Sequence, residues 1–245
     1  MSAADTPTPF RLGYVPGTTP AKWVRIWQER VPDVELELVA VPAAEAAGQV
    51  REGGVAAVLL RLPIDRTGLH AIPLYTETTV VVLPKDHLLA AVDEVSTEDL
   101  ADAVVLHPQD DVLDWTAPPG VPALERPETT ADAIELVAAG IGLLVVPQSL
   151  ARLHHRRDLT YRPLTEAPAS SRVALSWRED DESPLIEEFI GVVRGRTVNS
   201  TRGRAQAEEP KKQQAPKKQP PKNSASRVKR PQQKGGGGKG RKPRR

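Results

Sequence analysis

Residues 55–60 read Val-Ala-Ala-Val-Leu-Leu, and this run of apolar side chains decides the fold class. A continuous apolar run is expected of a strand that is buried on both faces, as strands of parallel sheets are. Upstream, the apolar run at 10–15 predicts a first strand, and the alternation at 34–41 predicts a second. Helices are predicted between them, ending near Arg30 and covering 43–51. The first sixty residues therefore predict a βαβαβ unit, with a mostly parallel sheet and helices on both faces.

The same alternation of strands and helices continues to about residue 196. Thr129 or Thr130 is expected to cap a helix that runs through Ala139, and Gly140-Ile141-Gly142 then turns the chain into an apolar strand. Ser183-Pro184 is expected to cap the last helix. The other predicted strands cover 69–75, 76–83, 103–106, 143–146, 159–163 and 172–177, and the other predicted helices are short and lie near 96–99 and 148–153.

The composition changes near Thr201. Residues 202–245 contain 16 Lys and Arg against Glu208 and Glu209, so this tail carries about +14, whereas the rest carries about −13. Apart from alanines, the only apolar side chain of the tail is Val228, so the tail cannot bury enough surface to offset the entropy of ordering it. We therefore expect residues 198–245 to be disordered.

Several classes of protein are excluded or disfavoured by composition and spacing. The chain has no Cys, so disulfide scaffolds and Cys-ligated zinc sites are excluded. His154 and His155 are adjacent and lack an acidic partner at metal-site spacing, so no metal site and no cofactor are predicted. We identify no catalytic residue, because no nucleophile stands at a recognisable spacing from a base. With neither a signal peptide nor a membrane-spanning run, we expect a cytoplasmic, non-enzymatic protein.

Five segments, in this order and spacing, resemble one protein family, the LysR-type transcriptional regulators. The resemblance is to their effector-binding, or substrate-binding, domain and covers roughly Phe10 to Arg196. The segments are Arg11-Leu12-Gly13, Val31-Pro32-Asp33-Val34-Glu35-Leu36, Pro73-Leu74-Tyr75-Thr76-Glu77, Val80-Val81-Val82-Leu83-Pro84-Lys85-Asp86-His87 and Ala138-Ala139-Gly140-Ile141-Gly142-Leu143-Leu144-Val145-Val146-Pro147.

This resemblance implies an α/β fold of the type 2 periplasmic-binding-protein kind, with two lobes joined by two crossover strands. It implies a flexible N-terminus at 1–9 and a substrate-binding domain at 10–197. The first lobe is expected at about 10–83 and 148–197, and the second at about 84–147.

The chain departs from the family pattern in two places. Ala56 stands where the family usually has an Asp entering the third strand. The family also carries an N-terminal helix-turn-helix, whereas only nine residues precede the first predicted strand here. Met1-Ser2-Ala3-Ala4 is typical of a translational start, so we expect a relative that naturally lacks that DNA-reading module.

Three residues of the first lobe are candidates for ligand binding. Thr18 and Thr19 precede the first helix, where free backbone N–H groups and the helix dipole favour an anion, and the family resemblance places effector contacts there. Arg61 follows the buried strand at the sheet edge where open α/β sheets bind ligands, and it could hold a carboxylate through two hydrogen bonds. The alternatives are that Thr19 only caps the helix and that Arg61 is solvated.

Two candidates come from the second lobe. His107 ends the predicted strand at 103–106, and Thr129 begins the helix that should face the cleft between the lobes. The alternative interpretations are that His107 is only a turn residue and that Thr129 is only a helix cap.

The tail supplies the candidate residues for nucleic-acid binding. Lys and Arg release counterions condensed on phosphate backbones, so such a tail binds DNA or RNA without reading sequence. Its rival interpretation is a solubilising or self-interacting tail. The candidates are Lys211, Lys212, Lys217, Lys218, Lys222, Arg227, Lys229, Arg230, Lys239, Arg241, Lys242, Arg244 and Arg245.

The sequence therefore favours a sensor of a small anionic effector that is linked to transcriptional regulation and has a basic tail for nucleic acid. The alternative is an interaction protein with a vestigial cleft, which pairs with a full-length LysR-type regulator. A homodimer is also expected from the resemblance, with Trp23, Ile26 and Trp27 of the first helix packing against a partner's second lobe near Ala131–Ala138. No membrane partner is expected.

Overall fold

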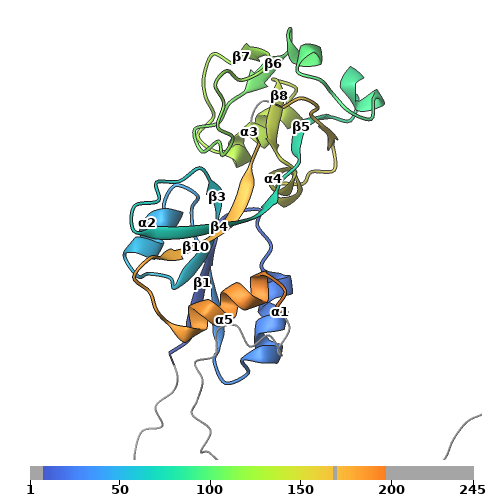
Figure 1. Ribbon diagram of the computed structural model, residues 1–245. Coiled ribbons are helices and arrows are strands. Elements are labelled where there is room, and N and C mark those ends of the chain that lie inside the picture. Colours follow the sequence, from blue (N-terminus) through green and yellow to red (C-terminus); the bar gives the residue numbers. More distant parts are fainter. Residues whose placement is uncertain (1–7, 168–169, 197–245) are drawn as a thin grey trace, which may run out of the picture. The chain divides into compact units, whose positions relative to one another are not determined.

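The computed structural model describes residues 8–167 and 170–196. Within them the chain forms two five-stranded sheets, which confirms the mixed α/β class (Figure 1). The expectations of a flexible N-terminus and a disordered basic tail fall mainly on residues 1–7 and 197–245, outside the described part of the chain. None of the described helices is long and apolar enough to cross a membrane.

The first sheet has the strand order β2-β1-β3-β10-β4. The predicted βαβαβ unit supplies its parallel part, because β1 pairs in parallel with both β2 and β3. Only β10 runs the other way: it is antiparallel to both β3 and β4, so β4 runs in the same direction as β3. The bounds are Phe10–Tyr14 for β1, Leu36–Ala40 for β2, Ala57–Leu62 for β3, Leu69–Thr76 for β4 and Arg172–Arg178 for β10.

Helices cover both faces of the first sheet. On one face, α1 (Ala21–Arg30) and α5 (Pro184–Val193) lie next to each other (Figure 1), and on the other face lies α2 (Ala46–Arg51). All six residues of β3 are buried, as its apolar run predicts for a strand between two helical layers.

Trp27 forms the centre of the core beneath α1. Its side chain is fully buried, its ring centroid lies 4.8 Å from that of Phe10, and its indole N–H donates to the carbonyl oxygen of Val34 at 2.9 Å. The ring of Phe189 on α5 completes the aromatic group. Trp27 is therefore unavailable for the dimer contact expected of it, although Trp23 and Ile26 remain partly exposed.

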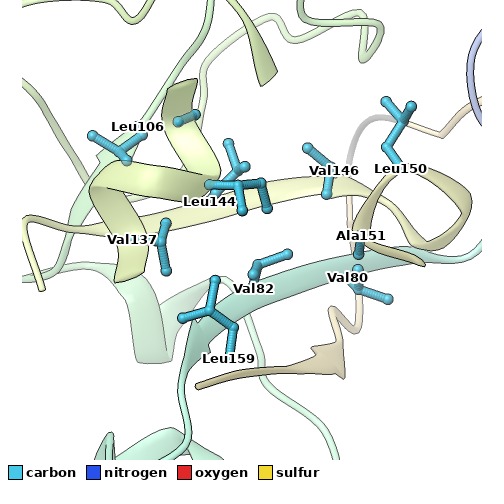
Figure 2. Packing of buried hydrophobic residues seen from close by; sticks show 11 residues of the cluster. Val80, Val82, Leu106, Val137, Leu144, Val146, Leu150, Ala151 and Leu159 are labelled. Atoms are coloured by element: carbon cyan, nitrogen blue, oxygen red, sulfur yellow. The ribbon is translucent and has the colours of Figure 1, made fainter. Parts of the chain in front are cut away.

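The second sheet has the strand order β7-β6-β8-β5-β9. One face is covered by α3 (Thr130–Ala138) and α4 (Gln148–Leu153). Figure 2 shows Val82 of β5, Leu144 of β8 and Val137 of α3 gathered in this core. The other face packs against Leu100 and Leu113. The strands are β5 (Thr79–Pro84), β6 (Val104–Leu106), β7 (Val121–Pro122), β8 (Leu143–Pro147) and β9 (Leu159–Pro163), and the short 3-10 helices are η1 (Leu88–Ala91) and η2 (Glu98–Leu100).

The sheets divide the chain at places that differ from the expected lobe boundaries. β5 and β9 both belong to the second sheet, so that sheet receives the chain from Thr79 to Pro163 rather than from 84 to 147. The connection from β4 to β5 is only two residues long, Glu77 and Thr78. The sequence of an apolar strand does not show which of the two sheets it joins, because that depends on the distant strand with which it pairs.

Candidate functional site

A buried ion pair lies where the chain passes between the two sheets. Arg61, at the end of β3, donates from Nε to Oε2 of Glu77 at 2.7 Å and from Nη2 to Oε1 of Glu77 at 3.3 Å. The two side chains are only 5% and 4% exposed. Glu77 begins the two-residue connection that leads into β5. The pair therefore joins the first sheet to the start of the crossing.

Two serines complete the coordination of this pair from other segments. Ser149, on α4, donates to Oε1 of Glu77 and accepts from Nη2 of Arg61 at 3.1 Å. Ser171, just before β10, donates to Oε2 of Glu77 at 2.5 Å, and its carbonyl oxygen accepts from the backbone N–H of Glu77 at 2.8 Å. Since Ser149 belongs to an element of the second sheet and Ser171 to the returning crossing, the network connects both sheets and both crossings.

The loop between β1 and α1 closes the network on the remaining side. Nη1 of Arg61 donates to the carbonyl oxygen of Pro16 at 2.9 Å. Gly17 has a φ of +84°, and a Cβ there would lie 2.8 Å from Oγ of Ser149 and 3.0 Å from Nη2 of Arg61. Only glycine satisfies both the left-handed backbone and this close approach. The loop is thus held against the ion pair.

The electrostatics of the network favour the ionised carboxylate. Burial by itself raises the pKa of Glu77, but the Arg61 guanidinium and the hydroxyls of Ser149 and Ser171 outweigh this and hold its pKa below the usual value. One N–H of the Arg61 guanidinium has no partner in the described residues, because four of its five donors are used.

Thr18 and Thr19 lie in the loop that the ion pair holds. The hydroxyl of Thr18 is buried and donates to the carbonyl oxygen of Val15 at 2.7 Å. Thr19 is exposed, and its side chain makes no hydrogen bond within residues 8–167 and 170–196. The N-cap of α1 is Pro20 and has no side-chain cap hydrogen bond, so the expectation that Thr19 caps this helix is wrong.

The two candidates from the second sheet lie together in a separate group. His107 follows β6, and its Nε2 lies 2.9 Å from Oδ2 of Asp111, a carboxylate that is 5% exposed. Thr129 is the N-cap of α3 and forms a capping box with Asp132. The loops that carry them lie side by side, because Nε of Arg126 donates to the carbonyl oxygen of His107 at 2.9 Å.

Asp111 organises the loop after His107. Its carboxylate accepts from the backbone N–H of Leu113 at 2.9 Å and from the indole N–H of Trp115 at 3.1 Å. Burial raises the pKa of Asp111, although these donors and His107 oppose the shift. The His107 side chain is 32% exposed, so its ring remains accessible while Asp111 fixes its orientation.

The structure thus brings the five candidate residues together as two groups, one on each sheet. Thr18 and Thr19 lie in the loop after β1, and Arg61 packs against that loop. His107 and Thr129 lie in the loops around β6 and α3. No hydrogen bond or ion pair joins the two groups within the described part of the chain. Residues 8–167 and 170–196 also contain no cluster of three or more acidic or histidine side chains that could hold a metal ion.

Sequence reasoning missed Glu77, Ser149, Ser171 and Asp111 as members of these groups. Glu77 and Ser171 are 94 residues apart, and Arg61 and Ser149 are 88 apart, so no local spacing indicates that they meet. A signal did exist for Asp111, because it follows His107 by four residues.

Two sheets with helical layers, joined by two crossings that share a buried ion pair, define a two-lobed α/β binding domain. The model of the LysR substrate binding domain family matches residues 9–197, and the chain belongs to this family. The expectation drawn from the five sequence segments is therefore confirmed.

Similar proteins of known name are transcriptional regulators and not enzymes. AlsR of Bacillus subtilis is 27% identical over 179 residues, which cover 69% of this chain and 59% of AlsR. CatR of Pseudomonas putida is 28% identical over 193 residues, covering 74% of this chain and 66% of CatR. A probable hydrogen peroxide-inducible genes activator of Mycobacterium avium is 32% identical over 199 residues, which cover 74% of this chain and 64% of that protein. The chain thus spans less than two thirds of the length of these regulators.

Solved structures support the fold. The effector binding domain of BenM with its effector benzoate has a TM-score of 0.64 at 22% identity, covering 76% of this chain and 90% of that domain. The reduced form of OxyR gives the same TM-score and identity, covering 78% of this chain and 97% of that structure. Both confirm the two-lobed effector-domain architecture.

Proposed function

We propose that this domain senses a small anionic effector, which binds between the group around Thr19 on the first sheet and the group around His107 on the second. The observation that carries the proposal is the Arg61–Glu77 network, because it connects both sheets to the loop that precedes α1. A ligand that contacts this loop would act directly on the junction of the two sheets. The family membership and the regulator names of the relatives support a role in transcriptional control.

The chemistry around Thr19 suits an anion. α1 begins next to Thr19, and the first backbone N–H groups of a helix favour negative charge. Thr19 adds its exposed hydroxyl group and Arg61 adds its remaining N–H, whereas the hydroxyl of Thr18 already donates to the carbonyl oxygen of Val15 and acts by shaping the loop. On the second sheet, we assign His107 as a contact through the accessible part of its ring, which Asp111 orients, and Thr129 as a contact through its partly exposed side chain.

Arg61 supports the site chiefly by holding the loop. Its guanidinium already carries Glu77, so an effector carboxylate has to share or compete for it. Replacing Arg61 would leave the Glu77 carboxylate buried without its cation, which costs stability and obscures any effect on binding. Thr19 is the sharper probe, because its side chain has no hydrogen-bond partner to lose among residues 8–167 and 170–196.

The proposal is tested by a thermal-shift screen of small carboxylates on the whole chain, followed by titration calorimetry of any hit. Thr19→Ala should weaken binding of the hit by roughly 10-fold, which corresponds to the loss of one hydrogen bond to a charged group. Thr116→Ala, which removes an exposed threonine from a loop of the second lobe, is the matched control and should bind as the unaltered protein does. Binding that is unchanged by Thr19→Ala would place the effector elsewhere.

We further propose that the basic residues at 211–245 bind nucleic acid without sequence preference. The support is the concentration of charge, since residues 202–245 contain 16 Lys and Arg and two Glu. This segment lies outside the described residues. A regulator of transcription meets its DNA in the cytoplasm, and we place the protein there as part of the same proposal.

A further inference from the structure

A second group of cationic side chains surrounds a cavity on the first sheet. The cavity lies between the edge strand β4 and the flank of α5 and has a volume of about 420 Å³. It is separate from the ion pair, because its β4 residues run from Leu69 to Ile72, whereas Glu77 follows the other end of the strand, roughly 16 to 26 Å away along the chain. Its lining residues are Arg66, Leu69, His70, Ala71, Ile72, Trp177, Glu187, Ile190, Arg194 and Arg196.

The charge of this cavity is strongly unbalanced. Arg66, Arg194 and Arg196 face a single carboxylate, that of Glu187. In the described part of the chain, the only side-chain hydrogen bond of Arg66 goes from Nη2 to the carbonyl oxygen of Ala71 at 3.3 Å. The side chains of Arg194 and Arg196 make no hydrogen bond or ion pair within residues 8–167 and 170–196. Among the residues that the structure describes, the guanidinium groups of Arg194 and Arg196 therefore have no anionic partner.

The cavity also has a flat aromatic wall. The ring of Trp177 is partly exposed and lies 5.4 Å from the ring of His70, tilted by 50°. Ile190 of α5 is buried beside it, in the same core cluster as Trp177. An indole face of this kind accepts a planar ring by stacking.

We propose that this cavity binds a nucleoside phosphate, with the phosphate on the arginines and the base against Trp177. Three guanidinium groups provide more positive charge than one carboxylate neutralises, and their planar fork matches phosphate oxygens. The volume lies within the range of small-molecule sites. The site is separate from the effector site proposed above and does not depend on it.

The test is calorimetry of the whole chain with AMP, adenosine and inorganic phosphate as three separate ligands at 150 mM salt. AMP should bind, and adenosine and phosphate should each bind at least tenfold more weakly, because each lacks one half of the contacts. The double variant Arg194→Gln/Arg196→Gln should raise the dissociation constant for AMP at least tenfold. Basic residues at 211–245 are the same in both proteins, so any background from them cancels.

The control is Arg25→Gln, which removes an exposed arginine of α1 outside the cavity and should leave AMP binding within twofold. Absence of AMP binding at millimolar concentration would overturn the proposal, and so would AMP binding that is unaffected by the double variant. If inorganic phosphate binds as tightly as AMP, the base contributes nothing to binding, and the proposed stacking on Trp177 is wrong. Loss of duplex DNA binding in the double variant, without any AMP binding, would make the cavity part of a nucleic-acid surface instead.

Discussion

Arg61 and Glu77 are the residues through which the two sheets depend on each other. Each side chain is buried. Among the described residues, Glu77 accepts from Arg61, Ser149 and Ser171, and Arg61 also donates to Ser149 and to the carbonyl group of Pro16. A buried pair adds little net stability, but removing one partner leaves an uncompensated charge. The pair therefore makes the junction specific rather than especially strong.

Glu77→Gln should lower the free energy of unfolding by about 3 to 5 kcal/mol at pH 7, because Arg61 loses its counter-charge. Glu37→Gln is the matched control: the Arg11–Glu37 pair is exposed, so its loss should cost about 1 kcal/mol or less. Urea unfolding of both variants measures the difference. Equal losses in the two would mean that the buried pair contributes no more than a surface pair.

The same variant gives the pH dependence. The pKa of Glu77 is lower in the folded protein than the ordinary glutamate value of 4.5, so its contribution to stability is present above 4.5 and is lost as the pH falls through the folded pKa. The difference in stability between the unaltered protein and Glu77→Gln should therefore persist at neutral pH and shrink as the pH falls through the lowered pKa of Glu77. A gap that grows on acidification would contradict the ionised pair.

At the scale of single elements, the two threonines that precede helices behave differently. Thr129 caps α3 with its hydroxyl accepting from the backbone N–H of Asp132 at 3.1 Å, whereas Thr19 makes no cap for α1. Thr129→Ala should cost about 1 kcal/mol of stability, and Thr19→Ala should cost almost none. Thermal unfolding of the two variants tests this. A larger loss for Thr19→Ala would show that it does cap α1.

Most elements could be predicted from sequence because their signals are local. The apolar run of β3 and the Thr129–Asp132 capping box depend on neighbours within a few residues. β7 was missed, because two residues in a Pro- and Gly-rich loop carry no period. The sheet to which β5 belongs and the partner of Arg61 depend on contacts between distant segments, and no spacing in the sequence encodes these.

At the scale of the whole molecule, the charge is divided between the domain and the residues that follow it. Residues 202–245 carry about +14, and the rest carries about −13. If about eight of these cations contact phosphates, the log–log salt slope of duplex binding should be near −7, with little difference between sequences. Fluorescence anisotropy on the whole chain and on residues 1–201 measures this. Tight binding by the shorter chain would place the nucleic-acid site in the domain.

The isolated segment 202–245 should bind duplex more tightly than the whole chain at low salt, because the acidic domain competes with DNA for the same cations. The gap should close as salt screens that attraction. Equal affinities of the isolated segment and the whole chain for duplex at low salt would show that the acidic domain does not compete with DNA.

The measurement that tests the effector site most directly is hydrogen exchange of the whole chain with and without the carboxylate found in the screen. Backbone amides of the loop at 15–20 and of the loop at 107–113 should both become protected, because the proposed ligand contacts one group on each sheet. Protection at both loops is the result expected of an effector held between the sheets. Protection confined to one loop, or to β4 and α5, would contradict a ligand that joins the two groups.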